Sequence, residues 1–198
     1  MWLRTNNGGS CLSIMYKHFT IFIVAGILTL ASGFSLAAEN KALSGKHKKI
    51  IKAFPSVQHV SADELGKMQA DDIVVFDVRE PEEYNVSHIE GAILVAPKIS
   101  AEDFIATYGE MVEDKTVVLY CSVGHRSSVL AEKVQTQLTA ASSGAVYNLE
   151  GGLFKWHNES MPLVTTNAEP TEYIHPYNFY WGRMVNQKSK RRYQPDTQ

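Results

Sequence analysis

Short apolar runs alternate with amphipathic or polar stretches through the middle of the chain. The runs at 73–76 and 116–120 are continuous and rich in valine, a pattern typical of strands buried on both faces of a sheet. Further strands are predicted at 57–60, 92–95 and 145–149, with helices near 61–69, 80–84, 101–111, 127–138 and 152–156. Because strand and helix alternate with short connections, we predict an α/β domain whose mostly parallel sheet carries helices on both faces.

The strand at 116–120 ends at Cys121, which opens a short polar loop followed by a helix. Such a loop points several backbone N–H groups and the positive end of the helix dipole at one spot, which stabilises a thiolate or a bound anion. The pKa of a free cysteine is about 8.5, and a helix N-terminus with a nearby cation can lower it to about 3.5–7.5. We therefore predict that Cys121 is a nucleophile; the alternative is an inert cysteine buried at a strand end.

The first 38 residues differ in composition from the rest of the chain. Residues 19–38 carry no charged side chain, follow the basic flank Lys17-His18 and end in small residues typical of a signal-peptidase site. We expect a signal peptide in 1–38, with Met15 as a candidate start, and hence a periplasmic or other extracytoplasmic location. The alternative is a membrane anchor at 19–38, since about 20 apolar residues can span a bilayer.

Composition also sets the remaining boundaries. Residues 39–54 are charged and rich in lysine, and we expect a solvated linker there. The folded domain is expected at 55–164 and a C-terminal tail at 165–198. Within the tail, the aromatic stretch 175–181 is expected to pack back on the domain, and the basic run 188–192 to be solvated.

Charge and cysteine content limit the classes of function. The chain of 198 residues has a formal net charge of −2, so its overall charge gives no reason to expect a nucleic-acid partner. Its seven histidines show no ligand-like spacing to cysteine or carboxylate residues, and we expect neither a metal nor a cofactor. Cys11 lies in the expected signal segment, which leaves Cys121 without a partner for an internal disulfide.

Three blocks of sequence resemble the signature blocks of single-domain rhodaneses: DVREPEEYNVSHIEGAI at 77–93, YCSVGHRS at 120–127 and NLEGGLFKW at 148–156. The similarity covers about residues 56–163 in the expected order and spacing, and it reaches neither end of the chain. It implies a three-layer α/β/α rhodanese-like fold with a five-stranded, mostly parallel central sheet. It also implies a cysteine that carries sulfane sulfur as a persulfide.

The same resemblance implies a sulfurtransferase in which Cys121 takes sulfur from thiosulfate or a similar donor and passes it to an acceptor. The acceptor would be cyanide, a thiol or a protein cysteine. The substrate site is expected in the residues that follow: Ser122, Val123, Gly124, His125, Arg126 and Ser127. Their backbone amides would hold the donor anion, Gly124 would allow a tight turn, and Arg126 would supply a fixed positive charge.

Several roles remain open from the sequence. Ser127 either caps the following helix or donates to the persulfide, and His125 either binds substrate or faces solvent. Asp77 and Arg79 follow the strand at 73–76, at the edge where α/β sites form, and the resemblance implies that the pair is chiefly structural.

Two other functions also stay open. One is a non-catalytic rhodanese-like module that binds a partner or holds a redox state. The other is a cysteine-dependent phosphatase, in which five residues separate the cysteine from the arginine. Only four residues separate Cys121 from Arg126, so the phosphatase is less favoured.

Overall fold

The computed structural model describes residues 39–140 and 144–195, and all of them belong to one compact unit. The expected signal peptide or anchor at 1–38 lies outside the described residues. Within the described ranges, no helix is both long and apolar enough to cross a membrane. The expected domain at 55–164 and its flanking segments 39–54 and 165–195 are thus parts of the same unit.

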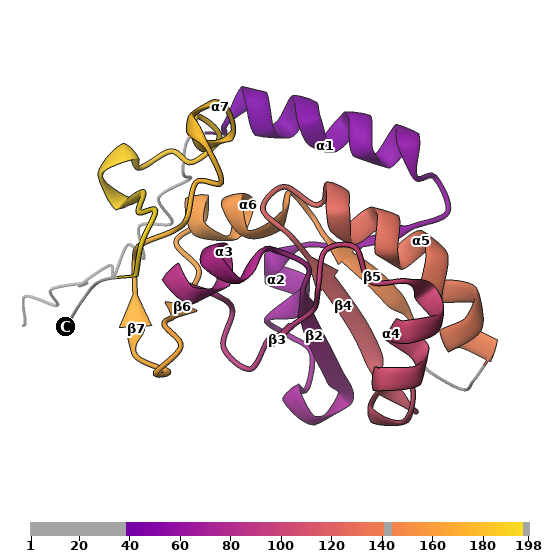
Figure 1. Ribbon diagram of the computed structural model, residues 1–198. Helices are drawn as coiled ribbons and strands as arrows, with labels where there is room; N and C mark the ends of the chain where they lie inside the picture. Colours follow the sequence, from indigo (N-terminus) through magenta and orange to yellow (C-terminus); the bar gives the residue numbers. More distant parts are fainter. Residues whose placement is uncertain (1–38, 141–143, 196–198) are drawn as a thin grey trace, which may run out of the picture. The chain divides into compact units, whose positions relative to one another are not determined.

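A five-stranded parallel sheet forms the centre of this unit (Figure 1). Its strands are β1 (Gln58–Val60), β2 (Ile73–Asp77), β3 (Ile93–Leu94), β4 (Thr116–Tyr120) and β5 (Val146–Leu149). They lie in the order β1-β5-β4-β2-β3, and every neighbouring pair is parallel. The predicted fold class is confirmed, and the two valine-rich runs form β2 and β4 in the middle of the sheet.

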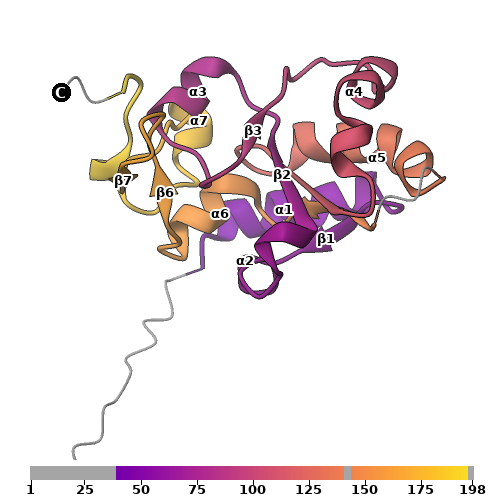
Figure 2. The same cartoon turned by 90° about the horizontal axis from the view of Figure 1, so that it is seen from below.

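Helices cover both faces of the sheet (Figure 2). The helices are α2 (Ala62–Leu65), α3 (Pro81–Val86), α4 (Ala101–Tyr108), α5 (His125–Ala140) and α6 (Gly152–Asn158), with 3₁₀ turns η1 (Ala70–Asp72) and η2 (Glu110–Val112). Helices α4 and α5 bury Phe104 and Val134 in the core on one face. Helices α2 and α6 bury Leu65 and Leu153 in the core on the other. The result is the expected three-layer arrangement, although α2 is shorter than the helix predicted at 61–69.

A further helix, α1 (Lys41–Ala53), occupies most of the segment expected to be a solvated linker. Leu43 and Ile50 are buried, and they lie two turns apart on one face of the helix. Leu43 packs into the core on the α6 side of the sheet. The expectation of a linker is therefore wrong for these residues. Although α1 is rich in lysine, it has one narrow apolar stripe, and this stripe is enough to dock the helix on the core of the domain.

The C-terminal segment packs against the same core. It comprises an antiparallel hairpin of β6 (Leu163–Val164) and β7 (Pro170–Thr171), then α7 (Phe179–Gly182) and the 3₁₀ turn η3 (Lys188–Lys190). Ile174, Met184 and Val185 are buried in the core, and the partly buried Trp181 packs against the same core. The aromatic stretch packs back only in part, because Phe179 exposes 91% of its surface.

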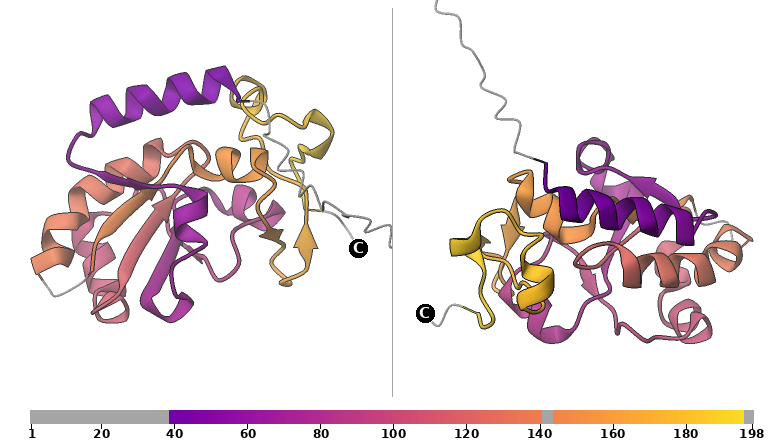
Figure 3. Two further views of the ribbon diagram at one scale, coloured as in Figure 1. Left: turned by 180° about the vertical axis from the view of Figure 1, so that it is seen from behind. Right: turned by 90° about the horizontal axis from the view of Figure 1, so that it is seen from above.

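The start of α1 and the C-terminal segment lie side by side (Figure 3). The Asn40 side chain donates to the Arg183 carbonyl at 3.2 Å and to Asn186 Oδ1 at 2.9 Å. Asn158 of α6 donates to the Met184 carbonyl at 2.8 Å and accepts from the Asn186 amide at 2.7 Å. Hydrogen bonds thus join both ends of the described chain to one another and to the domain.

Candidate active site

Strand β4 delivers Cys121 to the carboxyl edge of the sheet, where the chain turns into α5. Cys121 is a free cysteine and is almost fully buried. Helix α6 holds the loop from behind, because Leu153 N donates to the Cys121 carbonyl at 2.8 Å and Phe154 N donates to the Ser122 carbonyl at 3.0 Å. The backbone amides of residues 122–126, by contrast, donate to no group in the described part of the chain. They are available to an anion.

Two glycines make this loop geometry possible. Gly124 has φ +89°, and a Cβ there would lie 3.0 Å from Asn148 Nδ2. Gly152 at the start of α6 has φ +59°, and its Cβ would lie 2.2 Å from the Cys121 carbonyl oxygen. Side chains are strained at positive φ, and a Cβ contact of 2.2 Å cannot be relieved without moving backbone. The predicted tight turn at Gly124 is confirmed.

Arg126 lies in the first turn of α5 and is paired with Glu83 of α3. Its two terminal nitrogens donate to the Glu83 carboxylate at 2.8 and 3.0 Å, and the side chain of Glu83 is only 1% exposed. Ser122 Oγ also donates to Glu83, at 2.5 Å. Residues 121–126 together with Glu83 are called the floor of the site below.

The floor is electrostatically balanced. Burial alone would raise the pKa of Glu83, but hydrogen bonding and the charge of Arg126 outweigh burial and lower it. Burial alone would lower the pKa of Arg126, but the hydrogen bonds to Glu83 and the neighbouring charge of Cys121 raise it. Both groups are therefore charged at neutral pH. Arg126 was expected to supply a fixed positive charge, and the structure shows that the buried carboxylate of Glu83 holds its guanidinium in place.

Sequence reasoning missed Glu83 because the residue has a local explanation. It lies three residues after Glu80 at the start of α3, and its carboxylate accepts from the Glu80 amide at 3.1 Å as part of a capping box. Its bonds to Arg126 span 43 residues of sequence. The one signal in the sequence that could have pointed to Glu83 is that the start of α3 carries more than one acidic residue.

Cys121 opens into a pocket of about 240 Å³. It is lined by Lys46, Cys121, Ser122, Val123, His125, Arg126, Tyr177 and Trp181. Four of the six predicted substrate-site residues therefore line the pocket together with Cys121, while Gly124 shapes the turn. His125 is exposed and contacts the Phe54 ring edge-on, with centroids 5.6 Å apart. Burial first, then the charges of Lys46 and Arg126, lower the pKa of His125, so it is neutral at pH 7.

Ser127 lies behind the loop rather than in the pocket. Its hydroxyl is fully buried and donates to Asn148 Oδ1 at 2.6 Å. The side-chain amide of Asn148 in turn lies 3.2 Å from His59 Nδ1. The alternative of a helix cap is wrong, because α5 begins at His125 and the Ser127 hydroxyl is engaged with β5.

Asp77 and Arg79 form a buried ion pair at the carboxyl end of β2. Both side chains are 0% exposed, and Arg79 Nη2 donates to Asp77 Oδ2 at 2.6 Å and to the Ser87 carbonyl at 2.7 Å. Burial disfavours the charge of Arg79, but Asp77 outweighs burial and raises its pKa. Neither residue lines the Cys121 pocket. Their contacts tie β2 to the turn after α3, consistent with the structural role expected of them.

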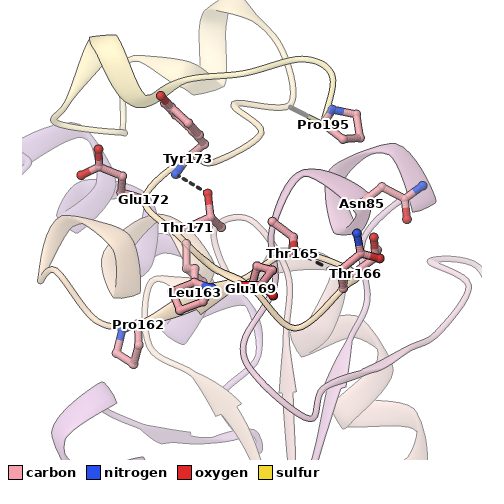
Figure 4. Close-up of a pocket in the computed structure, with 12 residues that line it drawn as sticks. Asn85, Pro162, Leu163, Thr165, Thr166, Glu169, Thr171, Glu172, Tyr173 and Pro195 are labelled. Carbon is pink, nitrogen blue, oxygen red and sulfur yellow. Dashed lines mark hydrogen bonds between the residues drawn. The ribbon is translucent and has the colours of Figure 1, made fainter. Parts of the chain in front are cut away.

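A larger hollow of about 610 Å³ lies beside the β6–β7 hairpin (Figure 4). Its polar lining comes from the hairpin and its surroundings: Asn85, Thr165, Thr166, Asn167, Glu169, Thr171, Glu172 and Tyr173. None of these side chains is a cysteine or histidine, and no basic residue lies among them. The hollow offers no nucleophile beside an anion site, so Cys121 remains the centre of the candidate active site.

Residues 61–159, half of the chain, match the family model of the rhodanese-like domain. The chain therefore belongs to the rhodanese-like family, a family that includes sulfurtransferases. The matched residues contain the floor of the site. They contain neither α1 nor the segment from β6 onward.

Individual relatives are distant. The chain is 28% identical over 110 residues to a protein named sulfurtransferase from Allochromatium vinosum, a match that covers 54% of this chain and 95% of that one. It is 30% identical over 118 residues to an uncharacterized protein of Synechocystis sp., covering 59% of this chain and 61% of that one, less than two thirds of its length. The crystal structure of a thiosulfate sulfurtransferase from Pseudomonas aeruginosa matches with a TM-score of 0.48 and 19% identity, covering 66% of this chain and 24% of that one.

Proposed function

We propose that the protein is a sulfurtransferase that carries sulfane sulfur as a persulfide on Cys121. The Cys121 thiolate attacks the outer sulfur of thiosulfate or a similar donor, a new S–S bond forms, and the donor's own S–S bond breaks with release of sulfite. A thiophilic acceptor then attacks the outer sulfur of the persulfide, and Cys121 leaves as the thiolate. No external oxidant or reductant is consumed in either step.

The observation that carries this proposal is that Cys121 lines a pocket together with loop residues whose amides donate to no other group of the described chain. The amides of residues 122–126 donate to no group in the described residues, and four of these five residues line the same pocket as Cys121, where the thiolate and the persulfide would carry negative charge. The first turn of α5 adds its dipole. These groups stabilise an anionic sulfur without a metal or an added base.

In this mechanism the guanidinium of Arg126 binds both Glu83 and the substrate. A guanidinium has five N–H donors; Glu83 accepts from the two terminal nitrogens of Arg126, and Ser122 Oγ accepts from Nη2 at 2.9 Å. The remaining donors can face the pocket that Arg126 lines, where a donor sulfonate would bind. The pairing with Glu83 fixes the orientation of the guanidinium before substrate arrives, which reduces the cost of ordering it.

The proposal is tested by exposing the purified protein to thiosulfate alone. Release of one sulfite per chain and a mass gain of one sulfur atom on the peptide that contains Cys121 are expected. Addition of cyanide should then yield thiocyanate with turnover. Cys121→Ser, which keeps the size and polarity of the side chain, should do neither. If the unmodified protein releases no sulfite and gains no sulfur, the protein is not a thiosulfate sulfurtransferase.

The same protein sample distinguishes the two other functions. A non-catalytic module would bind without sulfite release or persulfide formation. A phosphatase would hydrolyse an aryl phosphate, and Cys121→Ser would abolish that hydrolysis. The four-residue spacing between Cys121 and Arg126 favours sulfur transfer over phosphate hydrolysis.

A further inference from the structure

One side of the Cys121 pocket comes from outside the matched domain. Lys46 belongs to α1, whereas Tyr177 and Trp181 belong to the C-terminal segment, and all three lie beyond residues 61–159. These three residues are called the wall of the pocket. The wall and the floor line the same pocket of about 240 Å³, so a substrate bound in that pocket contacts both.

The wall is held in place by specific contacts. The Asn40 side chain bridges the start of α1 to the Arg183 carbonyl, two residues after Trp181. Asn178 caps α7 by accepting from Trp181 N at 3.0 Å. Trp181 packs against the core, and Lys46 Nζ lies 5.2 Å from the centroid of its ring. The two extensions are therefore joined to one another on this side of the pocket.

The wall presents one cation that no carboxylate neutralises. Within residues 39–140 and 144–195, no acidic side chain lies within ion-pair distance of Lys46, and no acidic side chain lines the pocket. Arg126 differs, since Glu83 neutralises it. Lys46 is half-buried, so its charge acts through a partly desolvated environment and is screened less than that of an exposed lysine.

The wall also presents aromatic faces. Tyr177 lies with its ring centroid 5.3 Å from the Arg126 guanidinium, and Trp181 lies beside Lys46. Thiosulfate and cyanide have no apolar surface that such rings would cover. A small organic molecule with a short carbon chain and an anionic end would contact the rings with its chain and Lys46 with its charge.

We propose that Lys46, Tyr177 and Trp181 form a substrate subsite that selects a small organic thiol bearing a carboxylate or sulfonate as the sulfur acceptor. This inference rests on the proposed function, because it names the acceptor of the persulfide on Cys121. The acceptor thiolate attacks the outer sulfur, a bond forms between the two sulfurs, and the bond to Cys121 Sγ breaks. The products are an organic persulfide anion and the Cys121 thiolate.

The experiment isolates the second half of the reaction. The protein is first loaded with thiosulfate, freed of excess donor, and checked for the sulfur adduct on Cys121 by mass spectrometry. Loss of the adduct is then timed with 3-mercaptopropionate and with its neutral amide, 3-mercaptopropionamide. Rates are divided by the thiolate concentration of each acceptor, since the thiolate is the reacting form.

The unmodified protein is expected to react about fivefold faster with the carboxylate than with the amide at low acceptor concentration, the ratio that one partly screened ion pair supplies. Lys46→Met should bring the ratio close to one, and Lys46→Arg should restore it. Trp181→Ala should slow both acceptors about fivefold, because both lose the ring face. The matched control is Lys49→Met, which removes the same charge from an exposed position on the same helix and should leave the ratio unchanged.

Two different failures can be told apart. If the adduct forms but the carboxylate and the amide react equally, or if Lys46→Met and Lys49→Met behave alike, the subsite is wrong and the sulfurtransferase stands. If no adduct forms on Cys121 in the unmodified protein, the proposed function fails, and the subsite fails with it.

Discussion

The floor and the wall of the Cys121 pocket differ in origin and in environment. The floor lies within the matched domain, and Glu83, Cys121 and Ser122 are buried in it. The wall comes from two extensions, and Tyr177 exposes 45% of its surface. The buried side chains of the floor are tied together by hydrogen bonds, whereas residues of a half-exposed wall can be substituted without loss of the fold. The floor is thus suited to fix the reaction, and the wall to fix the substrate.

The largest expected effect concerns the buried ion pair of Asp77 and Arg79 and its contribution to the stability of the fold. Asp77→Ala leaves the guanidinium of Arg79 buried without its carboxylate, because both side chains are 0% exposed. Loss of one partner of such a pair should lower the free energy of unfolding by about 3–5 kcal/mol, measured by urea denaturation.

The matched control for this substitution is an exposed pair. Asp63→Ala removes the carboxylate that pairs with Lys67 one helical turn away, where both side chains are more than 70% exposed. This change should leave the midpoint of unfolding almost where it is. Equal effects of the two substitutions would contradict the view that the buried pair of Asp77 and Arg79 stabilises the fold more than an exposed pair does.

The next effect concerns the charge in the floor itself. Arg126→Ala should slow sulfite release from thiosulfate by about 100-fold, the range found when one preorganised donor to a developing anion is removed. Arg126→Lys should recover only part of this rate, because an ammonium cannot donate to Glu83 through a planar fork. Arg183→Ala removes an exposed arginine beyond Trp181 and serves as the control. An Arg126→Ala rate within a few-fold of the unmodified rate would remove Arg126 from the mechanism.

A smaller effect follows from the pKa of Glu83. Because its pKa is lowered in the folded protein, the charged carboxylate stabilises the fold above its ordinary value of 4.5, and this stabilisation is lost as pH falls through the lowered value. Glu83→Gln should therefore be less stable than the unmodified protein at pH 7, by about 1–2 kcal/mol.

The stability difference caused by Glu83→Gln should shrink as the pH falls below about 4.5, the ordinary value. Urea denaturation of both proteins at several pH values between 3 and 7 measures it, with pH values chosen to bracket the titration of a carboxyl group. A difference that stays constant over this range would mean that the charge of Glu83 contributes nothing to the fold.

The smallest effect connects the wall to the floor. The charge of Lys46 is one of the causes, after burial, that lower the pKa of His125. Lys46→Met should therefore raise the pKa of His125, as followed by NMR titration of the imidazole ring. Lys49→Met should not. An unchanged His125 would mean that Lys46 does not act across the pocket.

Local pattern determined most of the domain. Each of the five strands falls within one or two residues of its predicted range, because an apolar run in a parallel sheet is a property of neighbouring residues. The position of Cys121 at the end of β4 and the turn at Gly124 follow from the same local signal. One wrong prediction also came from a local signal. Serine is a common helix N-cap, but Ser127 lies inside α5, where its hydroxyl donates to Asn148.

Only the tertiary structure brought together residues that are distant in sequence. Glu83 meets Arg126 because α3 and α5 both begin at the carboxyl edge of the sheet, and its local role as a capping residue concealed that contact. Lys46 meets Trp181 because α1 and the C-terminal segment dock on the same side of the core. Periodicity reports which face of an element is apolar, but not which other element covers that face. The sequence by itself therefore determined the domain and the place of Cys121 in it, and the packing of α1 and the C-terminal segment decided what surrounds that cysteine.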